Sequence, residues 1–258
     1  MTELIPLGNE LIYLAIPAIL IAGLVHGAFG LGFPMVATPL LALFTDVLTA
    51  MLITLLPTMA VNLSIISQSG LKQFKEVRGH LIIIPFTLAG TLLGTFLLVN
   101  LDPRPFLLLL ALATLLYLNQ DYLKKINFEW IRKYPLPAHV IFGTLAGFMA
   151  GSVNVMLPVL IILFMELRIA GAAMILIFNM NFFTGKITQS LVFLQQMQDV
   201  AGFLLQTLWL VPVAVFALMI GSKIRKKFDE TRYLKVLRAV LWLMSAILIV
   251  RFIASYTG

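Results

Sequence analysis

The sequence predicts an all-α polytopic membrane protein that consists of two inverted-topology repeats of five segments each. Three observations support this fold class. Of the 258 residues, 61% are hydrophobic and 11% are charged, and the mean hydropathy is +1.03. Apolar segments follow one another along the chain, and the two halves share a residue pattern. Because so few polar residues cannot cover a water-soluble globule, lipid is expected to solvate most of the exterior.

Ten apolar segments are candidates for membrane helices. They cover residues 11–29, 33–44, 47–66, 81–99, 106–118, 138–150, 157–165, 170–197 (with a polar interruption), 201–220 and 234–253. A helix needs about 20 residues to cross a hydrocarbon core of about 30 Å. The second and seventh segments are too short, because at 1.5 Å per residue they cover only about 18 Å and 14 Å. Each is expected to be a broken helix whose first turn lies inside the membrane, buried in protein or facing a wet cavity.

A constant sequence offset relates the two halves. Pairs that lie 124 positions apart are Gly23 and Gly147, Gly27 and Gly151, and Pro34 and Pro158. Pairs that lie 127 positions apart are Pro85 and Pro212, Gly94 and Gly221, Asp102 and Asp229, and Phe106 and Tyr233. A three-residue insertion in the second half accounts for the change of offset. The pattern predicts a first membrane repeat over residues 1–119, a polar linker over residues 120–136 and a second membrane repeat over residues 137–258.

The basic residues gather in three loops, which hold 14 of the 18 lysines and arginines. These are Lys72, Lys75 and Arg78, then Lys124, Lys125, Arg132 and Lys133 in the linker, and seven residues between Lys223 and Arg238. By the positive-inside rule all three loops face the cytoplasm. The basic loop follows the third segment in the first repeat but the fourth segment in the second repeat. The repeats are therefore expected to be inverted, with both termini outside a plasma membrane of the bacterial inner-membrane type.

The stretch GLVHGAFGLGFP, residues 23–34, returns in altered form as GFMAGSVNVMLP, residues 147–158. Glycine-lined breaks in corresponding apolar segments point to the binding site of a transporter. Gly27, Gly30 and Gly32 allow a ligand to approach the backbone, and the free N–H groups of a helix that starts at Phe33 attract anions. Close packing of helices explains Gly27 equally well. The second turn has lost these glycines and carries Asn154 instead.

Polar residues inside the apolar segments complete the candidate site. All eleven acidic residues fall in loops or at segment ends, so the segments offer donors for an anion rather than carboxylates for a cation. Lys186 either contributes positive charge to the site or extends to the membrane surface. His26 is a candidate proton carrier, or a neutral imidazole bonded to a backbone carbonyl. The other candidate substrate-binding residues, for which a role in joining helices is an equal alternative, are Asn62, Ser64, Asn181 and Gln189.

The repeated motif resembles the sulfite exporter TauE/SafE family, whose members transport small sulfur-containing and organosulfonate anions. The resemblance rests on AGLVHGAFGLGFPMVATPLL in the first half and AGFMAGSVNVMLPVLIILF in the second. The residues that match the family motif are Gly23, Gly27, Gly30, Gly32 and Pro34, followed by Gly147, Gly151 and Pro158. The second copy has Ser152 to Met156 where the family has further glycines. The resemblance implies the same fold and a related substrate.

These observations predict a secondary transporter that exports a small anion, such as sulfite, sulfoacetate or another organosulfonate, by alternating access around a midplane site. No Walker motif is present, so ATP is not expected to drive it. The alternatives are a membrane assembly protein that transports nothing and a transporter of a different small solute. We expect no catalytic residue, metal or cofactor, because the chain has no cysteine and three histidines. The net charge of +7 is attributed to the loops rather than to nucleic-acid binding. The expected partners are the anion and membrane lipid, and the sequence leaves the formation of a homo-oligomer open.

Overall fold

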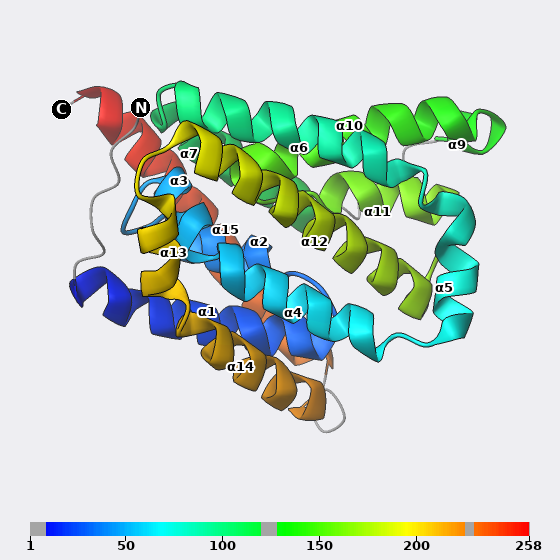
Figure 1. The fold of residues 1–258 in the computed structure, drawn as a ribbon, viewed down its shortest axis with the longest axis horizontal. Coiled ribbons are helices and arrows are strands. Elements are labelled where there is room, and N and C mark those ends of the chain that lie inside the picture. Colours follow the sequence, from blue (N-terminus) through cyan, green and yellow to red (C-terminus); the bar gives the residue numbers. More distant parts are fainter. Residues whose placement is uncertain (1–8, 120–127, 225–229, 258) are drawn as a thin grey trace.

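The computed structural model describes residues 9–119, 128–224 and 230–257, and most of these residues are helical (Figure 1). The helices are α1 (Asn9–Phe29), α2 (Phe33–Leu41), α3 (Val47–Ile53), α4 (Leu55–Gln68), α5 (Leu71–Val77), η1 (Arg78–His80), α6 (Ile83–Asn100), α7 (Arg104–Leu118), α9 (Trp130–Lys133), α10 (Pro135–Val153), α11 (Leu157–Glu166), α12 (Gly171–Gln196), α13 (Val200–Thr207), α14 (Leu210–Ile224) and α15 (Glu230–Thr257). The predicted all-α class is confirmed for the described part of the chain. The two short helices, α2 and α11, occur where the sequence predicts them.

Prolines bend two of the segments that the apolar pattern presents as straight. Helices α3 and α4 meet at Thr54 with a bend of 48°, and α13 and α14 meet near Trp209 with a bend of 44°. A proline removes the N–H that would bond the carbonyl four residues earlier, and its ring clashes with that carbonyl. Pro57 leaves the Ile53 carbonyl without its helical N–H donor in this way, and Pro212 does the same to the Leu208 carbonyl.

Helix α12 continues through the polar interruption of the eighth segment as one helix over 26 residues. Its polar side chains bond to carbonyls of the same helix instead of breaking it. Asn181 Nδ2 donates to the Ile177 carbonyl at 2.7 Å, and Thr184 Oγ1 donates to the Met180 carbonyl at 2.8 Å. These bonds satisfy the side chains while the backbone ladder continues.

Each half of the chain contributes one helix that lies against a helix of the other half at close range. Helix α1 packs along α14, and α10 packs along α6. A Cβ atom on Gly27 would lie 2.1 Å from the Leu218 carbonyl oxygen, and one on Gly147 would lie 2.0 Å from that of Thr87. Only glycine permits this approach of two backbones, as is common where helices associate in lipid.

Corresponding helices of the two halves, α1 and α10, run in opposite directions along the long axis of the molecule (Figure 1). Helix α1 runs from left to right in that view, and α10 runs from right to left. Helices α5 and α9 lie at the right-hand end, whereas α1 begins and α15 ends at the left. Arg132 on α9 pairs with Glu166 at the end of α11 at 3.0 Å. Arg251 on α15 donates to the Ala42 and Thr45 carbonyls beyond α2. The two short helices are thus fixed at opposite ends of the molecule.

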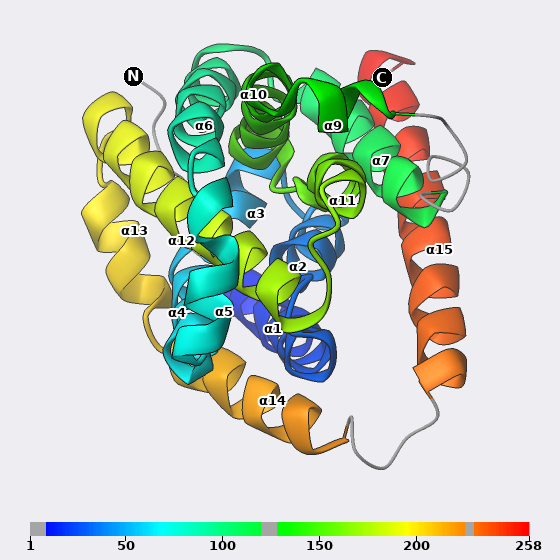
Figure 2. The ribbon, with the colours of Figure 1, turned by 90° about the vertical axis from the view of Figure 1, so that its right-hand side faces the viewer.

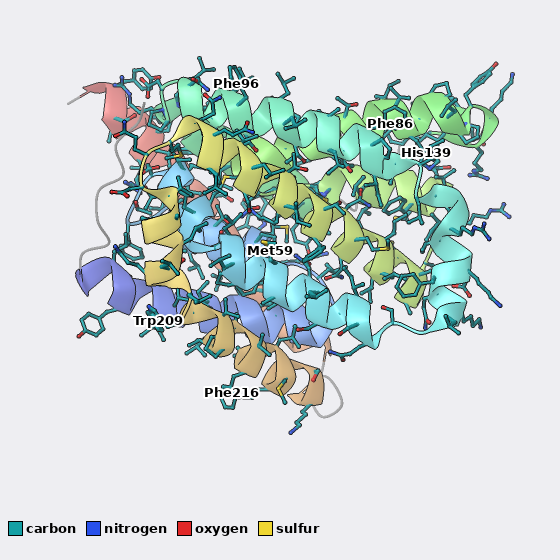
Figure 3. All side chains as sticks on the ribbon, viewed as in Figure 1. Met59, Phe86, Phe96, His139, Trp209 and Phe216 are labelled. Carbon is teal, nitrogen blue, oxygen red and sulfur yellow. The ribbon has the colours of Figure 1, made fainter. Side chains whose placement is uncertain are left out.

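In the described part of the chain, three helices are long and apolar enough to cross a membrane: Ile83–Asn100, Pro135–Val153 and Leu237–Tyr256. The number rises to five if each bent pair is one span. Large apolar side chains point outward from opposite faces of the molecule, as Phe96 and Phe216 do in Figure 3, and these two are 48% and 61% exposed. Such a surface needs lipid as its solvent. The protein is a multi-pass membrane protein.

Candidate functional site

Both predicted turns are sharp breaks with left-handed backbone. Between α1 and α2, φ is 78° at Gly30 and 101° at Gly32. Between α10 and α11, φ is 65° at Asn154, a residue type that tolerates this region better than most others. All three residues are buried. The chain therefore reverses inside the protein at both places, and Asn154 takes the conformational role that glycine has in the first turn.

His26 joins the first turn to α12. The backbone N–H of Phe33 donates to His26 Nδ1 at 3.2 Å, and His26 Nε2 lies 3.1 Å from Asn179 Oδ1. Since Nδ1 accepts a hydrogen bond, Nε2 carries the hydrogen and donates it to Asn179. Asn179 Nδ2 in turn donates to the Gly30 carbonyl at 2.7 Å. His26 is thus a neutral imidazole with a fixed tautomer, and it bonds a backbone N–H rather than the expected carbonyl.

Asn154 joins the second turn to the first half of the chain. Its Nδ2 donates to Thr38 Oγ1 on α2 at 2.8 Å and to Thr54 Oγ1 at the α3–α4 bend at 3.3 Å. The Thr54 hydroxyl donates to the Ala50 carbonyl at 2.9 Å, so it can only accept from Asn154. The two broken segments therefore meet in the interior, through Asn154 and α2.

Lys186 lies inside the molecule and does not reach its surface. It is 3% exposed, and its ammonium donates to Gln189 Oε1. Gln189 Nε2 donates to the Gly151 carbonyl at 3.2 Å and lies 3.5 Å from Thr95 Oγ1. Among the residues whose side chains the structure describes, no carboxylate pairs with Lys186. This buried positive charge is held by neutral groups alone.

The remaining predicted residues fall into different surroundings. Asn181 Oδ1 accepts from Thr87 Oγ1 at 2.8 Å, which joins α12 to α6. Asn62 is fully buried on α4. Ser64 lies two residues later, about 200° around the helix, and faces away from the side that carries Asn62. Ser64 is half-buried and donates to the Ala60 carbonyl at 2.8 Å. Gly27 lies against α14, the packing position described above. Among the described residues, no hydrogen bond joins Ser64 to Gln189.

A cavity of about 330 Å³ adjoins the start of α2. Its lining includes Val25, Gly32, Met35, Tyr117, Met174 and Leu237. In Figure 2, the view from the end that carries α5 and α9, the helices that supply this lining surround one region: α1, α2, α7, α11, α12 and α15. Gly32 is the one predicted site residue in the lining. His26 and Phe33 are buried beside it, whereas Lys186 lies farther along α12.

Several polar residues of this interior were missed in the sequence. Thr38 and Thr54 hold Asn154, and Thr87, Thr91 and Thr95 connect α6 to its neighbours. Thr91 Oγ1 donates to the Gly147 carbonyl at 3.3 Å and Thr95 Oγ1 to the Gly151 carbonyl at 3.2 Å. The three threonines of α6 recur every four residues, so they share one face of the helix. This spacing was a signal available in the sequence.

Comparison with known proteins assigns the family. No match was found among curated proteins, and none was found among solved structures. The model of the family described as "Sulfite exporter TauE/SafE" matches residues 15–249. That range includes both broken turns, the paired glycine helices and the buried polar residues of α12. The chain therefore belongs to the sulfite exporter TauE/SafE family of membrane transporters.

Proposed function

We propose that this protein is a secondary transporter that exports a small anion, such as sulfite, sulfoacetate or another organosulfonate. The observation that carries the proposal is the burial of Lys186 without a carboxylate partner among the described side chains. A charged group in the membrane interior costs about 3 kcal/mol on insertion scales and commonly marks a transport pathway. An anion beside Lys186 would neutralise a charge that the described protein groups leave unbalanced.

We further propose that residues 1–119 and 137–258 are inverted repeats, joined by a cytoplasmic linker over residues 120–136. The reciprocal packing of α1 on α14 and of α10 on α6 supports this division. So do the opposite directions of α1 and α10, because equivalent helices of inverted repeats cross the membrane in opposite senses (Figure 1). Basic segments α5 and α9 then lie in the cytoplasm, and both termini lie outside a bacterial inner membrane.

The cavity at Gly32 supports a route from the cytoplasmic end to the first turn of α2. An anion that enters it meets the N-terminal end of that helix, where backbone dipoles favour negative charge. The Phe33 N–H is bonded to His26 Nδ1 at 3.2 Å. An anion that accepts this N–H would release Nδ1, which is then free to take a proton. This exchange makes His26 the candidate for proton coupling, with Asn181 and Gln189 as neutral groups along the path between the two turns.

Efflux of a labelled anion from proteoliposomes tests the proposal. Vesicles that contain purified protein and labelled sulfite or a labelled sulfonate are given an inside-negative potassium diffusion potential. They should lose the label faster than protein-free vesicles that are loaded in the same way. The potential acts on a monoanion with about 2.3 kcal/mol per 100 mV. Vesicles with Lys186→Gln should lose most of this flux. Equal efflux from protein-containing and protein-free vesicles for every anion of the panel would overturn the proposal in favour of a non-transporting membrane partner.

A further inference from the structure

The second turn and the α4 face beside it carry buried oxygen atoms that have no hydrogen-bond partner among the residues that the structure describes. They are Thr58 Oγ1, Asn62 Oδ1 and Asn154 Oδ1, and all three residues are 0% exposed. A buried polar atom without a partner costs about 1–3 kcal/mol. Three such atoms in one region need an explanation, because buried polar groups are otherwise nearly always paired.

Two of the three residues, Thr58 and Asn62, lie on one face of the bent segment, and Asn154 contacts the same face. Thr54, Thr58 and Asn62 follow one another at intervals of four residues, so they share a face, and the Thr58 N–H donates to the Thr54 carbonyl at 2.9 Å across the bend. Asn154 Nδ2 reaches Thr54 Oγ1 at 3.3 Å. Thr54, which Asn154 contacts, precedes Thr58 by one helical turn and Asn62 by two.

The hydrogen-bond network fixes which atom of each amide is the oxygen. Asn62 Nδ2 donates to the Thr58 carbonyl at 2.8 Å, and a carbonyl requires a nitrogen opposite it. Asn154 Nδ2 faces Thr54 Oγ1, whose hydrogen is already given to Ala50. Both free amide atoms are thus acceptors. They repel an anion and attract a cation or a donor.

Backbone groups at this point add to the negative potential. Helix α10 ends at Asn154, and the carboxyl end of a helix carries a partial negative charge of roughly half an electron. Pro57 has no N–H, so the Ile53 carbonyl lacks the donor that a regular helix would supply. Carbonyls at helix ends and breaks bind the coupling Na⁺ in other secondary transporters. The ammonium of Lys186 donates to Gln189 and bonds none of these oxygens among the described contacts.

We propose that Thr58, Asn62 and Asn154 bind a sodium ion at the junction of the α3–α4 bend and the end of α10. The donor set consists of neutral oxygens without a carboxylate, which suits a monovalent ion, whereas tightly bound divalent ions recruit Asp or Glu. The site joins α4 to the second turn, so an ion there stabilises the contact between the two halves. Ion binding does not depend on the proposed anion transport; only its use as a coupling ion rests on that function.

Thermal unfolding of the purified full-length protein in detergent tests ion binding. The tryptophan fluorescence midpoint is measured while NaCl replaces choline chloride at constant total salt. A ligand that binds only the folded state raises this midpoint in a saturable way, so Na⁺ should raise it and KCl should not. Equal midpoints in all three salts, the result if water fills the site, overturn the proposal. An equal rise in KCl overturns the assignment to Na⁺.

Two substitutions and a matched control locate the effect. Thr58→Val and Asn62→Leu keep the approximate shape but remove the oxygens, and each should raise the Na⁺ concentration for the half-maximal midpoint shift at least tenfold. Thr114→Val removes another fully buried hydroxyl, which donates to the Leu110 carbonyl on α7 at 2.8 Å, and should leave that concentration unchanged. Thr58→Ser, which keeps the hydroxyl, covers the case in which the valine variant does not fold and should retain the wild-type value. Unchanged Na⁺ dependence in both site variants overturns the location.

A transport measurement separates this inference from the proposed function. Anion efflux that proceeds equally in Na⁺ and choline, together with no Na⁺ effect on unfolding, refutes the ion site and leaves anion transport intact. A Na⁺-specific unfolding shift in a protein that moves no anion of the panel supports the ion site and refutes the transport proposal.

Discussion

Gly30 and Asn154 adopt the same left-handed backbone conformation at corresponding positions of the two halves. They lie 124 residues apart, with φ of 78° and 65°, and each precedes a short helix. Asparagine is among the few residue types that visit this region without a large penalty. Its side chain adds what glycine cannot, a hydrogen bond to Thr38 in the other half of the chain.

Substitutions of Asn154 should separate the backbone role of this residue from its side-chain role. Asn154→Gly keeps the turn and loses the bonds to Thr38 and Thr54, whereas Asn154→Leu also adds left-handed strain of about 1–2 kcal/mol. We expect unfolding midpoints to fall in the order wild type, glycine, leucine, measured by tryptophan fluorescence in detergent. A leucine variant as stable as the glycine variant would show that the left-handed conformation is not required.

The places of the broken helices could be predicted from sequence because their signals are local. Glycine and proline mark both breaks, and the charge of α9 and α5 marks the loops. The bends at Thr54 and Trp209 were missed, although Pro57 and Pro212 indicate them. A continuous apolar run hides such a bend, since hydropathy records burial and not the loss of one backbone hydrogen bond.

The contacts of the candidate site could not be predicted in the same way. The bonds from His26 to Asn179 and from Asn154 to Thr38 join residues more than 100 positions apart. Local periodicity places each side chain on a helix face but does not say which distant helix that face meets. The same limit applies to Gly27, where the sequence left binding and packing open. The structure decides for packing, because the α14 backbone occupies the space that a side chain at Gly27 would need.

Glycine substitutions should divide packing residues from site residues. Gly27→Ala places a Cβ atom 2.1 Å from the Leu218 carbonyl oxygen, so α1 and α14 must separate and the unfolding midpoint should fall sharply. Gly32→Ala meets nothing closer than 3.7 Å, and its main cost is the left-handed backbone, about 1–2 kcal/mol. Anion affinity of the folded Gly32→Ala protein, measured by calorimetry, should fall because the residue lines the cavity. Wild-type affinity in this variant would remove the cavity from the binding path.

The proposed orientation predicts opposite labelling of two groups of single cysteines. Lys72→Cys on α5 and Lys133→Cys on α9 are exposed positions at one end of the molecule and should react only from the cytoplasm. Asn100→Cys, an exposed position where α6 ends, should react from outside. Membrane-impermeant maleimide on intact cells and on inverted vesicles measures this in a chain without native cysteines. Reaction of Lys72→Cys and Lys133→Cys from opposite faces would contradict the inverted repeat.

A stacked histidine pair should make stability fall in acid. His80 and His139 have ring centroids 5.7 Å apart, and burial, followed by the charge of His139, lowers the pKa of His80 from 6.5. The folded state therefore binds fewer protons than the unfolded state, so stability is complete above about pH 6.5 and falls as the pH drops below that value. His80→Phe should flatten the dependence of the unfolding midpoint between pH 7 and pH 5. A wild-type slope in this variant would assign the acid sensitivity to other groups.

Lys186 gives the sharpest test of the anion site. If its ammonium contributes charge to the bound anion, Lys186→Gln should weaken binding by roughly 1.5–3 kcal/mol, the range for a hydrogen bond to a charged group. Lys186→Arg should retain part of the affinity, because it keeps the charge but changes its geometry. Lys72→Gln, on an exposed turn of α5, is the control for net charge and should bind as the wild type does. The measurement is the dissociation constant for the best anion of the transport panel in detergent. Equal constants for Lys186→Gln and Lys72→Gln would mean that the buried ammonium is structural, and anion selectivity would then depend on the first turn of α2 and on His26 beside it.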